Sequence, residues 1–246
     1  MIDDMIEARR RRLAISSQSV PNDLLTLLLT ASDPKNGSGL SPAEIRGNIS
    51  TFFATGFEST TNALTWSLYL LSLDPEWRER VEHEVDREMP DGRYTEGSLD
   101  RLINIRAVAE EAMRLYPPVP VMGRQAIGAD RVAGHDIAPG TLVIIAPGIL
   151  HRHRLLWSDP DVFDPSRFLP GEREKIGRYA YLPFGAGPHV CIGQHFSMQE
   201  IVIVLASIVR SFRCELAPGH HVWPVHKVSL RPRGGLPMTL RRRTSH

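Results

Sequence analysis

Cysteine is scarce in this chain of 246 residues, which contains only Cys191 and Cys214. The two lie far apart in the sequence and share no Cys-x-x-Cys spacing, which argues against a disulfide scaffold or a structural zinc site and fits a reducing cytoplasm. Cys214 falls in a segment, 212–216, that we expect to be a strand. We interpret it as a small hydrophobic residue packed in the core.

Excess charge and long apolar runs are also lacking. The formal net charge is +1, which favours neither a nucleic-acid partner nor a membrane surface. The start of the chain is acidic and then turns basic at Arg9, the reverse of a secretory leader. The most apolar segment, 49–73, contains Glu58 and Asn62, which favours a buried helix over a membrane span. We therefore expect a cytoplasmic protein without a membrane or nucleic-acid partner.

A glycine-rich stretch, 184–193, presents one cysteine just before an apolar run that we expect to be helical. It reads Phe-Gly-Ala-Gly-Pro-His-Val-Cys-Ile-Gly, with Cys191 as its only sulfur. Glycine lets backbone approach a flat ligand closely, because no Cβ intrudes. A cysteine beside a helix N-terminus has its thiolate stabilised by the amide dipoles, and such a thiolate suits a soft metal such as iron.

This stretch resembles the cysteine-ligand loop of the cytochrome P450 family at Phe184, Gly187, Cys191 and Gly193. The resemblance implies a heme cofactor with Cys191 as the axial iron ligand, a type of ligand that favours O–O cleavage. It also implies that His189 contacts a heme propionate. A reduced cysteine in a Gly-rich turn is the alternative interpretation.

A long helix is predicted over 40–74, beginning with a capping box at Ser41 and Glu44. Its middle, 54–61, contains a glycine, an acid and several hydroxyl groups, which predicts a local opening of the helix. This segment resembles the P450 helix on the oxygen side of the heme. The resemblance implies that Glu58 and Ser59 deliver protons during oxygen activation, although the family more often has threonine where Ser59 stands. A polar patch for helix packing is the alternative.

A second helix, predicted over 99–116, contains Glu111 and Arg114 on one face. Together with the Tyr-Pro-Pro that follows, the pair has the Glu-x-x-Arg form of P450s. The resemblance implies a buried ion-pair network of Glu111, Arg114 and Arg167 that supports the cysteine loop. We assign all three residues a structural role, because loss of one would leave a buried charge unpaired.

Short strands are predicted over 119–125, 131–133 and 141–145, separated by glycine-containing turns. By resemblance, Arg124 and His151 contact the heme propionates, a role that suits donor groups. The alternative is that each is an ordinary surface residue. The spacing of His151 and His153 does not by itself indicate a metal site.

The end of the chain is predicted to contain an apolar helix over 195–212, a hairpin over 231–240 and a frayed basic tail, 241–243. The expected fold is mainly α with small β-sheets: the C-terminal half of the P450 fold, in one truncated domain, 1–246, organised around the long helix and the heme-ligand loop. The missing half predicts an exposed apolar patch and weak heme binding.

The implied function is a heme-thiolate monooxygenase that inserts one atom of O₂ into a small apolar substrate, with electrons from a ferredoxin or flavoprotein. The alternatives are a non-catalytic remnant that binds heme weakly or not at all, and a half-protein that needs a separate N-terminal half. A peroxygenase or rearrangement enzyme on the same scaffold also stays open.

Overall fold

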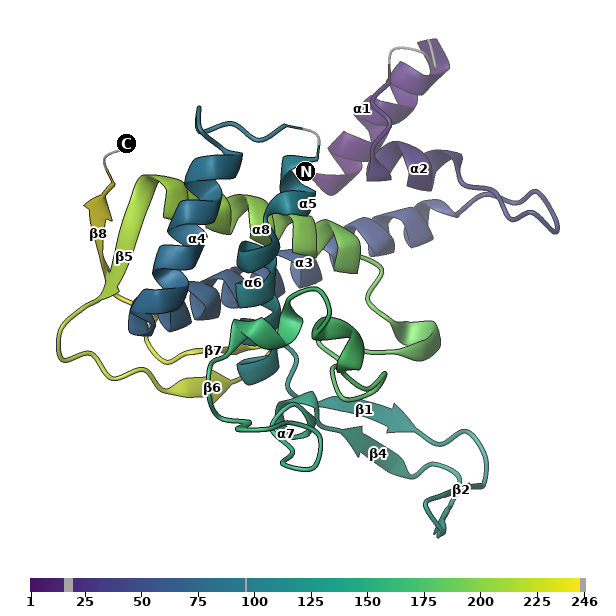
Figure 1. Ribbon diagram of the computed structural model, residues 1–246. Helices are drawn as coiled ribbons and strands as arrows, with labels where there is room; N and C mark the ends of the chain where they lie inside the picture. Colours follow the sequence, from purple (N-terminus) through teal and green to yellow (C-terminus); the bar gives the residue numbers. More distant parts are fainter. Residues whose placement is uncertain (16–19, 96, 244–246) are drawn as a thin grey trace. The chain divides into compact units, whose positions relative to one another are not determined.

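The computed structural model describes residues 1–15, 20–95 and 97–243, which form two compact units, Met1–Glu58 and Ser59–His246 (Figure 1). Each unit is described by itself. The long helix α3, Pro42–Leu73, begins in the first unit and ends in the second.

The first unit contains α1, Ile2–Ile15, and α2, Leu24–Thr30, together with the start of α3. Asp23 caps α2 by accepting a hydrogen bond from the Thr26 amide at 3.0 Å, and its carboxylate also pairs with Arg9. The small core of this unit is formed by three buried isoleucines, Ile6, Ile45 and Ile49.

Helix α3 begins as the sequence predicts. The Glu44 carboxylate accepts from the Ser41 amide at 2.8 Å, and the Glu44 amide donates to Ser41 Oγ at 3.3 Å, which completes the capping box. The predicted opening in the middle of the helix is wrong, because α3 is helical without interruption from Pro42 to Leu73. The Thr55 hydroxyl donates to the Thr51 carbonyl at 2.8 Å, so the bond predicted from the hydroxyl to the backbone forms without breaking the helix.

Three helices enclose the main core of the second unit and lie next to one another in Figure 1: α4, Pro75–Glu88; α6, Ile103–Leu115; and α8, Gln194–Ser211. Fully buried aliphatic side chains from all three meet there: Val81, Val85, Ile105, Val108 and Leu205. Two helices of four residues, α5, Ser98–Arg101, and α7, Pro147–Leu150, connect longer segments.

The strands form two-stranded antiparallel sheets. Strand β1, Met122–Gln125, pairs with β4, Leu142–Ile145, and β2, Asp130–Val132, pairs with β3, His135–Ile137. The three strands predicted in this region are confirmed: β1 and β4 are shorter than predicted, β2 is shifted by one residue, and β3 is an addition to the prediction.

The C-terminal segment differs from the prediction. Strand β6, Pro224–His226, pairs with β7, Leu230–Pro232, while β8, Met238–Arg242, pairs with β5, Phe212–Leu216. The predicted hairpin over 231–240 is therefore wrong, since its two arms belong to different sheets. The predicted frayed tail, 241–243, is also wrong for a physical reason: Arg241 pairs with Glu215, and Arg243 forms a double contact with Asp86.

No helix in the described part of the chain is both long and apolar enough to cross a membrane.

Candidate functional site

The glycine-rich loop places the Cys191 thiol at the surface, immediately before α8. Gly185 and Gly187 have φ angles of +75° and +74°, in the left-handed region that favours glycine. The loop closes on itself through a hydrogen bond from the Cys191 amide to the Phe184 carbonyl at 2.9 Å. The Phe184 ring packs on a buried cluster around Met113 and Met198, so the position of the thiol is tied to the core.

The segment just before the loop is held by side chains from other elements. The Tyr181 hydroxyl donates to the Glu110 carbonyl on α6 at 2.8 Å. The Leu182 amide donates to Nε2 of His151 at 2.8 Å. Both bonds fix the backbone a few residues before Phe184, and the Tyr181 ring also packs against the His151 and Phe168 rings. Sequence reasoning did not identify Tyr181, because nothing in the local pattern shows which buried carbonyl its hydroxyl reaches.

Arg114 lies at the centre of a buried polar network. Its Nε and Nη2 contact the two carboxylate oxygens of Glu111 at 2.6 and 2.8 Å, and both side chains are 0% exposed. The remaining guanidinium hydrogens are donated to the backbone carbonyls of His151, Pro160 and Val162. This planar fork satisfies a buried charge completely, which is the geometry that arginine provides and lysine does not.

Arg167 joins this network from the 3-10 helix Pro165–Phe168. Its Nε lies 3.7 Å from Glu111 Oε1, and the Asp164 amide donates to the same oxygen at 2.8 Å. The structure thus brings together the three residues that the sequence analysis grouped. They connect α6 to the 151–168 segment, which contains the His151 ring that holds Leu182.

His151 is buried, which contradicts the alternative that it is an ordinary surface residue. Its side chain is 0% exposed, and Nε2 accepts the Leu182 amide while Nδ1 has no partner among the described residues. Burial lowers the pKa of its imidazole to about 4, so the ring is neutral near pH 7. The bond from the Leu182 amide to Nε2 ties His151 to the segment just before the loop, and the predicted propionate contact stays a prediction.

Arg124 and His189 are both exposed. Arg124 lies on β1, and its Nη1 donates to the Gly123 carbonyl at 2.8 Å. A Cβ added at Gly185 would lie 3.6 Å from Met122 Sδ, so the N-terminal end of β1 lies against the loop. The structure therefore brings Arg124 and His189 to neighbouring elements, and propionate binding by these two residues stays a prediction.

Glu58 and Ser59 are consecutive residues of α3, both half-buried. Glu58 ends the first compact unit and Ser59 begins the second. Their backbone is helical, so the two side chains leave the helix about 100° apart. Their role as a proton relay stays a prediction.

The surface beside the Cys191 thiol suits a flat, apolar ligand. The side chains of Val190, Ile192 and Phe196 are 45%, 82% and 71% exposed. Gly193 borders the sulfur, since a Cβ added there would lie in ordinary contact with Cys191 Sγ at 3.8 Å. A single reachable thiol, glycine backbone and exposed apolar side chains form the donor set and surface that a heme requires on its thiolate side.

Comparisons with known proteins identify the family. The Cytochrome P450 family model matches residues 1–237, and the chain belongs to this family. It is 35% identical over 219 residues to cyclooctat-9-en-7-ol 5-monooxygenase of Streptomyces melanosporofaciens, covering 89% of this chain and 47% of that protein. It is 36% identical over 224 residues to cytochrome P450 4V2 of Homo sapiens, covering 90% of this chain and 42% of that protein.

Among solved structures, the heme domain of cytochrome P450DA matches with a TM-score of 0.91 and 31% identity, covering 100% of this chain and 53% of that one. The predicted fold class is confirmed: mainly helical with small antiparallel sheets, as in P450 heme domains. The chain spans about half the length of the relatives it matches. Heme is the cofactor that the family implies.

Proposed function

We propose that this chain is the heme-ligating portion of a heme-thiolate monooxygenase, with Cys191 as the iron ligand. The observation that supports this proposal is the exposed Cys191 thiol at the start of α8, in a loop whose backbone is fixed on both sides. The match of the family model over residues 1–237 supplies the chemical context.

Different residues of this chain have different roles in the proposed reaction. A bound heme supplies oxygen activation, from which one oxygen atom enters a small apolar substrate with electrons from a ferredoxin or flavoprotein. The Cys191 sulfur donates electron density to the iron. The Glu58 carboxylate and the Ser59 hydroxyl hold and pass a proton, and Arg124 and His189 bind the carboxylates of the cofactor. The loop residues Phe184, Gly187 and Gly193 shape the surface on which the cofactor lies.

A second candidate is a chain that holds heme only weakly, or only together with a separate N-terminal polypeptide. The observation that favours it is coverage, because the chain spans 42% to 55% of its relatives and of the heme domains it matches. With a separate polypeptide, this chain would supply the cysteine loop, and the partner would supply the other side of the cofactor site.

The test is the absorption spectrum of the purified chain, expressed with heme supplied, reduced, and exposed to carbon monoxide. We expect the strongly red-shifted Soret band of a heme with a thiolate opposite carbon monoxide. Cys191→Ser should abolish this band, because a hydroxyl is a poor ligand for iron at neutral pH. Cys214→Ala is the matched control, since Cys214 is the other thiol, buried on β5.

The spectra of the wild type and the two variants distinguish the two candidate functions. The red-shifted band in the wild type and in Cys214→Ala, but not in Cys191→Ser, supports the proposal. A chain that folds but retains no heme favours the second candidate. A band that persists in Cys191→Ser would show that Cys191 is not the ligand.

A further inference from the structure

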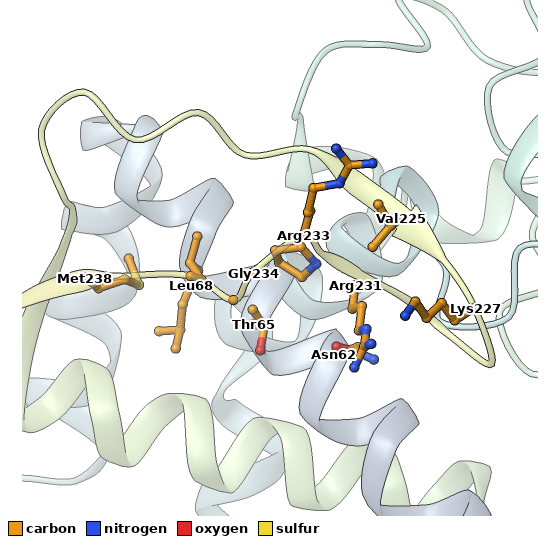
Figure 2. A pocket seen from close by; sticks show the side chains of 12 residues that line it. Asn62, Thr65, Leu68, Val225, Lys227, Arg231, Arg233, Gly234 and Met238 are labelled. Carbon is orange, nitrogen blue, oxygen red and sulfur yellow. The ribbon is translucent and has the colours of Figure 1, made fainter.

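A cavity unrelated to the cysteine loop lies between the β6–β7 hairpin and helix α3, with a volume of about 720 Å³. Figure 2 shows Asn62 of α3 near the hairpin, and Leu68, further along the helix, beside the segment that joins Gly234 to Met238. All its lining residues belong to the second compact unit, and none comes from the loop 184–193.

Three cationic side chains line this cavity: Lys227, Arg231 and Arg233. None of them forms an ion pair with a carboxylate in the described ranges, and the lining residues include neither Asp nor Glu. In Figure 2 Arg231 reaches from β7 towards Asn62, and Lys227 extends in the same direction from the hairpin turn. Like charges gathered at one concave surface repel one another, and a bound anion would relieve that repulsion.

The rest of the lining is apolar with a few polar groups. Leu68 on α3 and Val225 and Met238 on the strands contribute aliphatic surface. Asn62 and Thr65 lie near the cations, but Asn62 Nδ2 already donates to Ser229 and the Thr65 hydroxyl to the Thr61 carbonyl, so the cations are the donors left for a ligand. An apolar surface with a few convergent polar groups is typical of small-molecule sites, and here those groups are cationic.

The cavity is preformed, because hydrogen bonds fix the hairpin to α3. Asn62 Nδ2 donates to Ser229 Oγ at 2.6 Å, and Trp66 Nε1 donates to the Leu230 carbonyl at 3.0 Å. The Trp66 side chain is 0% exposed, so this second bond is protected from water. A ligand would therefore meet a hairpin that already lies in place, and the ordering cost would fall on the exposed side chains of Lys227, Arg231 and Arg233.

We propose that this cavity binds an amphiphilic organic anion, a carboxylate or phosphate head group on an aliphatic body. The head group is held by Arg231 and Lys227, with Arg233 at the rim, and the aliphatic body contacts Leu68, Val225 and Met238. Arginine provides a two-point contact to either head group, and lysine adds a compact charge. This site is separate from Cys191 and requires no heme.

The test is calorimetric titration of the heme-free chain at low salt with octanoate, octyl phosphate, inorganic phosphate and octyltrimethylammonium. We expect octanoate or octyl phosphate to bind, and the cationic amphiphile not to bind. Inorganic phosphate should bind more weakly because it lacks the aliphatic body. Added salt should weaken binding, since the cations are exposed. The two amphiphilic anions distinguish a carboxylate ligand from a phosphate ligand.

The variant Lys227→Gln with Arg231→Gln should weaken binding roughly tenfold or more, because it removes the charge-assisted contacts. The matched control is Lys35→Gln with Arg154→Gln, an exposed lysine and arginine outside the cavity whose loss changes the net charge equally. Circular dichroism should show both variants folded.

The proposal is overturned if neither anionic amphiphile binds, if octyltrimethylammonium binds as tightly, or if both double variants bind like the wild type. Because the titration uses heme-free protein, failure of heme binding at Cys191 would leave its result unaffected.

Discussion

Gly185, directly after Phe184 in the cysteine loop, has a φ angle of +75°. For Gly185→Ala we expect a loss of about 1–2 kcal/mol in the free energy of unfolding, the cost of a left-handed conformation for an L-residue. Crowding adds little, because the new Cβ would meet Met122 Sδ at 3.6 Å and the His189 carbonyl at 3.8 Å. Urea denaturation measures the change.

Gly128→Ala is the control for this substitution. Gly128 has no heavy atom within 4 Å of an added Cβ and no φ angle in the left-handed region. We expect its stability to stay within about 0.5 kcal/mol of the wild type. Equal effects of the two substitutions would contradict the assignment of strain to Gly185.

His151 makes folding sensitive to acid. Its pKa is about 4 in the folded chain, against 6.5 for an ordinary histidine, so below pH 6.5 the unfolded chain binds a proton that the folded chain does not. Stability due to this residue is complete above pH 6.5 and falls as the pH drops towards 4. Between pH 7.5 and pH 5 the loss should be about 2 kcal/mol.

The measurement is urea denaturation of wild type, His151→Asn and His135→Asn at both pH values. His151→Asn should lower stability at pH 7.5 and show a smaller further loss at pH 5. His135→Asn, an exposed histidine on β3, should keep the wild-type pH dependence. An unchanged pH dependence in His151→Asn would count against a buried neutral imidazole.

For single residues, motif spacing predicted which side chains would interact better than it predicted how buried they would be. Glu111 and Arg114 share a face at i and i+3, and the structure joins them with Arg167. His151 was assigned to the cofactor because its residue type suits a carboxylate. Its burial depends on Tyr181 and Leu182, which lie some thirty positions further along the chain, so a local reading could not reveal it.

Among the elements, helix α6 is tied to the 151–168 segment by one guanidinium. Arg114→Lys keeps the charge but removes the fork that contacts Glu111 and three carbonyls. We expect a loss of roughly 3 kcal/mol or more, because buried acceptors and a buried carboxylate lose their partners. Thermal and urea denaturation measure it.

Arg80→Lys is the matched control for this element. Arg80 pairs with Glu76 one turn away on α4, and both side chains are largely exposed. Such a pair contributes little, so we expect a change below about 0.5 kcal/mol. A comparably small effect of Arg114→Lys would refute the structural role given to the buried network.

Element starts and ends were predictable where local chemistry marks them. Ser41, Pro42 and Glu44 mark the start of α3, and Asp74 and Pro75 mark the boundary between α3 and α4. Strand pairing at the C-terminus was not predictable. The residues of β8 fit either a local hairpin or a distant partner, and nothing in their local pattern selects β5 over the nearer β7.

For the whole molecule, heme binding should raise the free energy of unfolding. A heme that binds the folded chain and not the unfolded one raises the free energy of unfolding by about 2.7 kcal/mol when its concentration is one hundred times its dissociation constant. We expect added heme to raise the melting temperature of the wild type and of Cys214→Ala. The melting temperature of Cys191→Ser should rise much less, and an equal rise in all three would indicate binding away from the cysteine loop.

The hydrogen bonds between the β6–β7 hairpin and α3 also determine when α3 can complete its folding during synthesis. Asn62 and Trp66 reach partners 167 and 164 positions later, and Arg243 reaches Asp86 across 157 positions. While a ribosome is still making this protein, α3 must wait for these partners, and its apolar surface stays available to chaperones for most of translation. Such long-range closure also slows folding. A chain that ends before residue 229 would therefore lack the partners of Asn62 and Trp66 and leave this surface of α3 uncovered. We expect proteases to degrade it faster than the 246-residue chain.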